Sequence, residues 1–177
     1  MIVDLKTISQ VPRHFDLSFE PQWWRSQQQG DDQIRGFHGS LRAHIEIHRA
    51  GSGYQVNGNL AGILELRCDR CLESYLHQMN LNFSYPLVPL PDSAEYELEL
   101  LEEEMSADFI TGEELHLDEI VKEQIYLSLP IKCLCDEFCA GLCPTCGTNL
   151  NTGKCTCQRK EGHPGFSKLR NLKIQGE

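Results

Sequence analysis

The chain alternates between apolar and polar side chains from residue 41 to residue 85, which is the pattern of half-buried β-strands. Apolar residues recur at every second position in three runs, and Gly51-Ser52-Gly53 provides a tight reversal between the first two. The pattern therefore predicts three consecutive antiparallel strands. Their inward-facing residues are Leu41, Ala43, Ile45 and Ile47, then Tyr54, Val56, Leu60, Leu64 and Leu66, then Tyr75, Met79, Leu81, Phe83 and Tyr85.

Glycines and prolines modify this strand pattern. Gly58 and Gly62 lie on the apolar face of the second run, where glycine indicates a bulge or a close approach of another group. Proline cannot donate a hydrogen bond to a neighbouring strand, so Pro86, Pro89 and Pro91 predict the end of the sheet.

The period changes to that of a helix at residues 117–129. Asp118 and Glu119 favour a helix N-terminus here, and Pro130 ends the helix. Residues 1–35 are weakly patterned, although Phe15 to Phe19 alternates like a short strand. The predicted fold class is α+β, an antiparallel β-sheet with one main helix. The helical stripe consists of Leu117, Ile120, Val121, Gln124, Ile125 and Ser128.

Charge is concentrated in one segment of the 177-residue chain, whose net charge is -10. Twelve of its 26 acidic residues lie between Asp92 and Glu119, where there is no Lys or Arg, so the remainder is nearly balanced against 16 basic residues. Such a segment predicts an exposed acidic loop at 92–119. We expect a β-rich domain at 1–132 and a cysteine-rich module with a short C-terminal helix at 133–177.

The chain has nine cysteines and no recognisable signal peptide or membrane-spanning run. These features predict a cytoplasmic protein whose thiols stay reduced. In a reducing compartment, clustered cysteines indicate metal ligation in preference to disulfide bonds. Six of them lie between Cys135 and Cys157, and a Cys-x2-Cys pair lies upstream in the turn between the second and third strands.

Counting the thiols in pairs predicts two zinc sites of four thiolates each. Cys143-Pro144-Thr145-Cys146-Gly147 is a turn typical of zinc ligation, and Cys155 and Cys157 can close the same site. Cys68 and Cys71 then combine with Cys135 and Cys139, and Cys133 is left over. Four alternatives stay open: one zinc held by any four of the six C-terminal thiols, an iron–sulfur cluster, a redox-active Cys68-x2-Cys71 pair, and a site in which His163 replaces a C-terminal cysteine.

Catalysis is not predicted. His44 and His48 lie on the polar face of a strand, and a closed four-thiolate zinc site has no open position for water or substrate. Trp23 and Trp24 could form a platform on which bases stack, but we interpret them as core or interface residues, which is the commoner role of paired tryptophans. The C-terminal basic residues are as typical of a solvated tail as of a phosphate contact, namely Arg159, Lys160, Lys168, Arg170 and Lys173.

The order of these motifs resembles the YceD family, the large ribosomal RNA subunit accumulation proteins of bacteria and plastids. The resemblance spans roughly residues 36–173. It rests on Cys68-Asp69-Arg70-Cys71, the helix segment 117–125, the run 141–151 and Cys155-Thr156-Cys157. It implies a non-enzymatic role in accumulation of large-subunit (23S) ribosomal RNA.

The leading hypothesis is therefore a ribosome-assembly factor with structural zinc that binds ribosomal RNA or a ribosomal protein, with no membrane or small-molecule partner. In this hypothesis the acidic segment shields a basic ribosomal protein before assembly. The alternative is a thiol-redox or zinc-buffering protein that uses Cys68 and Cys71. A DNA-binding transcription factor ranks last, because the chain lacks a basic recognition helix.

Overall fold

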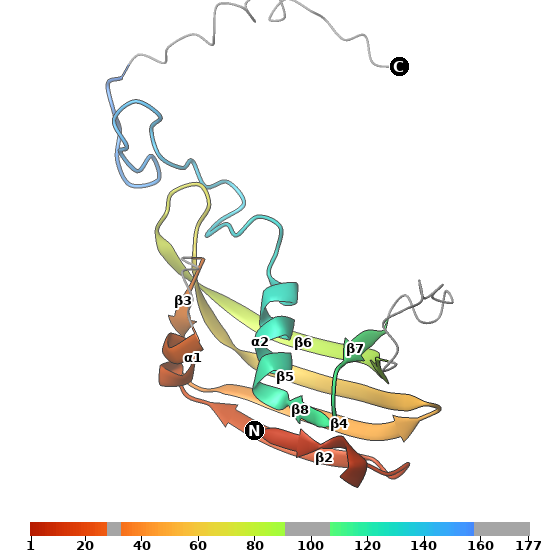
Figure 1. The fold of residues 1–177 in the computed structure, drawn as a ribbon. Coiled ribbons are helices and arrows are strands. Elements are labelled where there is room, and N and C mark those ends of the chain that lie inside the picture. Colours follow the sequence, from red (N-terminus) through yellow and green to blue (C-terminus); the bar gives the residue numbers. More distant parts are fainter. Residues whose placement is uncertain (28–32, 91–106, 158–177) are drawn as a thin grey trace, which may run out of the picture.

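The computed structural model describes residues 1–27, 33–90 and 107–157. Within them, a six-stranded sheet has the order β2-β4-β5-β6-β7, with β3 paired to β5, and β1 and β8 form a separate pair. Figure 1 shows helix α2 across one face of the main sheet and the cysteine-rich segment projecting from one end. The elements are β1 (Ile2–Asp4), the 3-10 helix η1 (Leu5–Thr7), β2 (Arg13–Phe19), α1 (Pro21–Gln27), β3 (Ile34–Phe37), β4 (Leu41–Ala50), β5 (Gly53–Arg67), β6 (Ser74–Pro89), β7 (Asp108–Ile110), β8 (Glu114–His116) and α2 (Leu117–Ser128).

The three strands predicted from the alternating pattern are β4, β5 and β6, and each pairs antiparallel with the next. The inward residues of β4 are buried at every second position, as are Val56, Leu60, Leu64 and Leu66 of β5. The inward residues of β6 are buried or half-buried, while its intervening residues are exposed. The α+β fold class, mostly antiparallel with one main helix, is thereby confirmed, although β6 and β7 pair in parallel.

The prediction that Pro86 ends the sheet is wrong, because β6 continues through it to Pro89. Pro86 is paired with Gln55 of β5, and the neighbouring strand β7 begins its pairing with β6 only at Leu87. In the described residues the other edge of β6 therefore faces no strand at Pro86. A proline is tolerated there because no neighbouring strand on that edge needs a hydrogen bond from residue 86, so the missing backbone N–H costs nothing.

The glycines of β5 accommodate close approaches, as one of the two sequence interpretations predicts. A Cβ atom at Gly58 would overlap the ring of Phe83 on β6, and one at Gly62 would lie 2.8 Å from Cδ1 of Leu41 on β4. The absence of a side chain at these positions lets the larger inward residues of the neighbouring strands fill the core.

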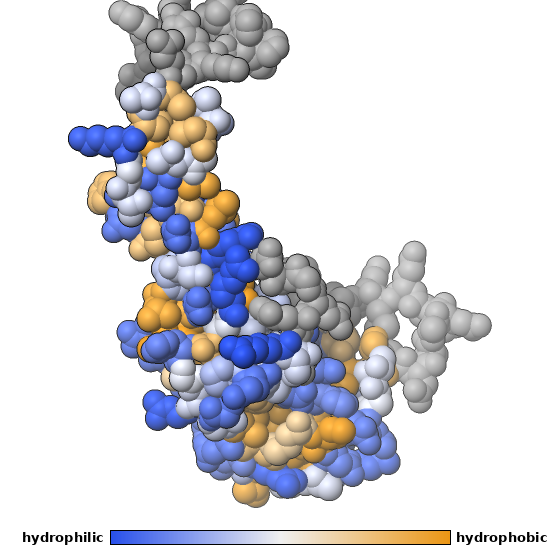
Figure 2. All heavy atoms as spheres, turned by 90° about the vertical axis from the view of Figure 1, so that its left-hand side faces the viewer, coloured by the Kyte–Doolittle hydropathy of each residue, from blue (hydrophilic) through white to orange (hydrophobic). Residues whose placement is uncertain are grey.

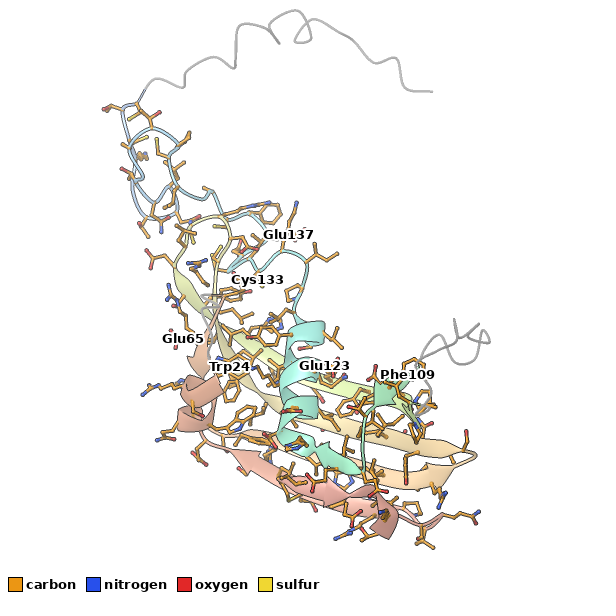
Figure 3. The ribbon with its side chains drawn as sticks, in the orientation of Figure 1. Trp24, Glu65, Phe109, Glu123, Cys133 and Glu137 are labelled. Atoms are coloured by element: carbon orange, nitrogen blue, oxygen red, sulfur yellow. The ribbon has the colours of Figure 1, made fainter. Side chains whose placement is uncertain are left out.

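Helix α2 closes the core over the inner face of the sheet. The stripe predicted for it is buried at Leu117, Ile120, Val121, Gln124 and Ile125, and the helix ends one residue before the predicted boundary. Trp24 of α1 is only 1% exposed, and its ring lies 5.6 Å from that of Tyr126 on α2. Figure 3 labels Trp24 between the two helices. Core packing, not base stacking, is thus the role of Trp24.

Parts of two predictions lie outside the described residues. The acidic loop was expected at 92–119, and only its end is described, where β7 and β8 are short strands. The expected C-terminal helix and the basic residues from 159 onward also lie outside. The division into domains at residue 132 stays a prediction. Neither described helix has the length and apolar character needed to cross a membrane.

Candidate metal centres

Eight of the nine cysteines gather into two groups of four, with all sulfur atoms of a group within 4.8 Å of one another. We call Cys68, Cys71, Cys135 and Cys139 the hairpin site, and Cys143, Cys146, Cys155 and Cys157 the knuckle site. These are the groups predicted by counting pairs. The structure thus places each of the eight candidate ligands in one of the two predicted sites. Metal binding by these sites stays a prediction.

The hairpin site lies at the turn between β5 and β6. Those strands are the longest in the described residues, with 15 and 16 residues, and their turn carries Cys68 and Cys71 to the end of the sheet. The segment that follows α2 brings Cys135 and Cys139 to the same turn. Cys68, Cys71 and Cys139 are buried, whereas Cys135 is exposed.

The sulfur separations in the hairpin site fit a tetrahedral metal. Sγ of Cys68 lies 3.8 Å from Sγ of Cys139, and Sγ of Cys71 lies 3.7 Å from Sγ of Cys135. A tetrahedron with metal–sulfur bonds of about 2.3 Å has sulfur–sulfur edges of roughly 3.8 Å. A disulfide would need sulfurs about 2.05 Å apart, and these cysteines are free thiols.

Hydrogen bonds fasten the cysteine-rich segment to the β5–β6 turn independently of any metal. The Nη1 group of Arg70 donates to the carbonyl oxygens of Glu137 (3.1 Å) and Cys139 (3.0 Å), and the Arg70 carbonyl accepts from the N–H of Leu142 (3.1 Å). Asp69 and Cys133 form a second connection, because each backbone N–H donates to the other residue, at 2.8 and 2.7 Å. The turn is therefore the docking point of the whole segment.

The knuckle site is built within the projecting segment, which Figure 2 shows as a narrow extension from the wider sheet body. The N–H of Gly147 donates to the Cys143 carbonyl (2.9 Å), and the N–H of Cys143 donates to the Thr148 carbonyl (2.8 Å). A hollow of about 230 Å³ is lined by Cys143, Cys155 and Cys157 together with Pro144, Thr145 and Leu150. The knuckle site is more exposed than the hairpin site, since Cys143 is the one buried ligand of the four.

Electrostatics in both groups favour a cation at the centre. Burial opposes ionisation of Cys68, but backbone N–H groups directed at its sulfur outweigh burial and lower its pKa to about 6. Burial and the neighbouring thiols raise the pKa of Cys135 to about 12. In the knuckle site, backbone N–H groups lower the pKa of Cys143 to about 6, and the neighbouring Cys146 raises that of Cys157 to about 12. The hydroxyl of Thr148 also lowers the pKa of Cys146. Each group therefore contains at least one thiol that ionises readily, and a bound cation would relieve the repulsion that raises the pKa of Cys135 and Cys157.

Cys133, the leftover cysteine, is part of the hydrophobic core. Its side chain is 3% exposed, and its Sγ lies 3.7 Å from the Pro130 carbonyl oxygen. In Figure 3 it lies between the end of α2 and the β5–β6 turn, apart from both groups of four. A buried cysteine in this setting behaves as a small apolar residue.

Three polar residues that organise the sites were missed from the sequence, namely Asp69, Arg70 and Asn151. Asp69 and Arg70 lie inside the first Cys-x2-Cys turn, and this position is a signal that their backbones and side chains face the ligands. Asn151 lies in the loop of the knuckle site, and its Nδ2 donates to Sγ of Cys139, a ligand of the hairpin site, at 3.3 Å. No spacing rule links Asn151 to the hairpin site, so the three-dimensional structure was needed to find it.

The histidines of β4 lie beside carboxylates. Nδ1 of His44 lies 2.7 Å from Oδ1 of Asp16 on β2, and Nδ1 of His48 lies 3.7 Å from Oε1 of Glu46. Neither histidine belongs to a group that can hold a metal among the described residues.

The described end of the acidic segment lines a separate hollow of about 560 Å³ between β6, β7, β8 and α2. Asp108, Glu114, Glu119 and Glu123 contribute carboxylates, and burial together with Asp108 raises the pKa of Glu123. No Lys or Arg of the described chain lines this hollow. It is therefore a region of concentrated negative charge.

Comparison with known proteins identifies relatives over most of the chain. A chloroplast protein of Arabidopsis thaliana named "Large ribosomal RNA subunit accumulation protein YCED homolog 1" is 25% identical over 157 residues, which cover 76% of this chain and 49% of the relative. The Zea mays protein of the same name is 25% identical over 152 residues, covering 72% and 52%. An uncharacterized protein of Mycobacterium tuberculosis is 28% identical over 110 residues, covering 62% and 51%.

The chain spans about half the length of these curated relatives. No solved structure matches it. The family model described as "Large ribosomal RNA subunit accumulation protein YceD" matches residues 56–173, which include β5, β6, α2 and all eight candidate metal ligands. This match covers well over half of the chain and confirms the resemblance noted in the sequence, so the chain belongs to the YceD family.

Proposed function

We propose that this protein is a non-enzymatic factor that supports accumulation of large-subunit (23S) ribosomal RNA by binding ribosomal RNA or a ribosomal protein. It binds two structural zinc ions, of which the one in the hairpin site holds the C-terminal module on the sheet and the one in the knuckle site stabilises the module itself. Support for the biological role comes from family membership and from the printed names of the plant relatives. We place the protein in the cytoplasm, where its thiols stay reduced.

The observation that carries the structural part of the proposal is the hairpin site. Its ligands come from two segments that are 64 residues apart or more, and they meet at one turn. Four thiolates suit zinc and leave no open coordination position, so the metal would stabilise the fold and would not activate water. Binding energy at such a site is folding energy, because the unfolded chain has no preformed site.

Charge favours a basic ribosomal protein as the partner at one end of the sheet. The hollow beside β7 carries four carboxylates and no described Lys or Arg. A surface of this kind attracts cationic segments and repels phosphate. Assembly intermediates captured with the tagged protein, with and without nuclease treatment, separate the two partner classes: a protein partner stays bound after nuclease, and an RNA-mediated one is lost.

The test of function is complementation of cells that lack the protein. Cys68→Ser combined with Cys71→Ser removes two hairpin ligands, and we expect it to bind one metal ion fewer and to restore less 23S ribosomal RNA, measured relative to 16S, than wild type. The matched control is Ser74→Ala with Gln78→Ala, two exposed positions on β6 of the same hairpin. Full restoration of 23S RNA by the cysteine variant, despite its lost metal, would contradict the proposal.

A thiol-redox function has one observation in its favour, which is the lowered pKa of Cys68. That thiol is 0% exposed, however, and a substrate disulfide cannot reach it without opening of the site. The redox alternative predicts a reversible Cys68–Cys71 disulfide in the metal-free protein and activity that survives metal removal. Thiol counting in glutathione buffers, with and without bound zinc, distinguishes it from the structural role.

A further inference from the structure

The hairpin site and the knuckle site are linked by one amide side chain. Asn151 lies in the loop between the two cysteine pairs of the knuckle site. Its Nδ2 group donates to Sγ of Cys139, a ligand of the hairpin site, at 3.3 Å. Its Oδ1 atom accepts from the backbone N–H of Ala140, the residue after that ligand, at 2.7 Å. Both ends of the amide are therefore bonded to the edge of the hairpin site.

The position of Asn151 depends on the knuckle loop. The side chain of Asn149 accepts from the N–H of Asn151 at 3.0 Å and from its Nδ2 at 2.9 Å. The N–H of Leu150 donates to the Gly141 carbonyl at 2.9 Å, and the N–H of Gly153 donates to the Asn149 carbonyl at 2.9 Å. Cys146 and Cys155 bracket this loop, so a metal in the knuckle site would fix both of its ends.

An N–H group that donates to a ligating sulfur stabilises the thiolate form, which is the form that binds metal. Groups that bond to metal ligands in this way typically change metal affinity 10–100-fold when they are removed. Asn151 is suited to this task, because its oxygen is held by Ala140 and its nitrogen is thereby directed at Cys139.

We propose that Asn151 is a positioning residue through which metal binding at the knuckle site strengthens metal binding at the hairpin site. The inference rests on the metal binding proposed above. Because coupling between two sites is reciprocal, a metal in the hairpin site strengthens binding at the knuckle site by the same factor. The two sites then load together, and loss of one metal loosens the attachment of the other.

The experiment measures the affinity of the hairpin site for Zn²⁺ in a double-mutant cycle on the full chain. One axis is Asn151→Ala. The other is Cys143→Ser combined with Cys146→Ser, which removes the knuckle site. Competition with a chelator gives the affinities, and the thiolate-to-metal absorption of the Co²⁺ form reports how many sulfurs ligate each metal.

We expect Asn151→Ala to weaken Zn²⁺ binding at the hairpin site by 10–100-fold when the knuckle site is intact. In the background without the knuckle site, the same substitution changes the affinity less than threefold, because the loop that aims Asn151 is no longer held. Asn151→Asp keeps an acceptor for the Ala140 N–H but loses the donor, so its affinity falls at least as far as that of Asn151→Ala. Thr152→Ala, an exposed neighbour in the same loop, leaves the affinity unchanged.

Two results would overturn the inference while the proposed function stands. One is an Asn151→Ala protein that binds two Zn²⁺ ions with wild-type affinity. The other is an equal loss of affinity in both backgrounds, which would make Asn151 a local ligand partner without coupling. A wild-type chain that binds no metal would instead contradict the proposed structural zinc itself, and circular dichroism of each variant shows that the sheet is folded.

Discussion

Leu72 and Gly147 follow the second cysteine of the two Cys-x2-Cys turns, and both have left-handed backbones, with φ of 62° and 73°. Glycine adopts this conformation without steric cost, whereas a residue with a Cβ loses about 1–2 kcal/mol. The sequence therefore predicted the geometry of the knuckle turn from Gly147 but gave no such signal for Leu72, whose side chain is 52% exposed.

The metal ligands themselves could be predicted, because thiol pairs are local. The contact from Asn151 could not, since it depends on how two loops pack.

At the residue scale, we predict that Leu72→Gly stabilises the metal-loaded protein by about 0.5–1 kcal/mol, since relief of the left-handed strain exceeds the entropy cost of a new glycine. Leu72→Ala removes the same exposed side chain but keeps the strain, so it gains nothing. Urea unfolding of the three proteins at a fixed zinc concentration measures this difference. Lower stability of Leu72→Gly than of Leu72→Ala would show that strain at residue 72 is not the controlling effect.

At the element scale, periodicity predicted the elements that are long enough to express it, namely β4, β5, β6 and α2, and the alternation from Phe15 to Phe19 predicted most of β2. It missed α1, because seven residues give barely two turns, and Trp24 is the one buried residue among those of α1 whose burial is described. Strands β7 and β8 have three residues each, too few for an alternating pattern to be recognised. Pro86 misled the prediction of the end of β6 because sequence does not reveal which edge of a strand lacks a neighbour at a given residue.

The packing of β5 against β6 provides a prediction at the same scale. Gly58→Ala places a methyl group against the ring of Phe83, so we expect a loss of about 1–3 kcal/mol in the free energy of unfolding. Gly36→Ala on β3 is the matched control, because nothing lies within 4 Å of its added Cβ atom. In a chain that carries Phe83→Leu, adding Gly58→Ala should lower the free energy of unfolding by less than it does in the wild type, because the ring that the new methyl group overlaps is gone. Equal stability of the two glycine variants in urea would contradict the close approach.

At the scale of the whole molecule, we infer that a metal ion in the hairpin site fastens the projecting C-terminal module to a sheet that α2 has already closed, and that a second metal ion in the knuckle site stabilises the module itself. The thiol count predicted this arrangement, and the sulfur separations of 3.7 and 3.8 Å in the hairpin site fit it. In the proposed function, the metals hold the surfaces that bind ribosomal RNA or a ribosomal protein in position, but they do not themselves contact the partner. Arg70 and Asn151 extend the connection beyond the ligands, through bonds to backbone carbonyls and to a ligand sulfur.

The most direct test is native mass spectrometry of the purified chain, compared with its denatured mass after thiol alkylation. We predict two zinc ions per folded chain and nine alkylated cysteines after unfolding, with no disulfide. A chain that carries a single zinc would support the alternative in which one ion selects four of the six C-terminal thiols. A metal-free folded chain, with or without a Cys68–Cys71 disulfide, would contradict the claim that metal fastens the module to the sheet.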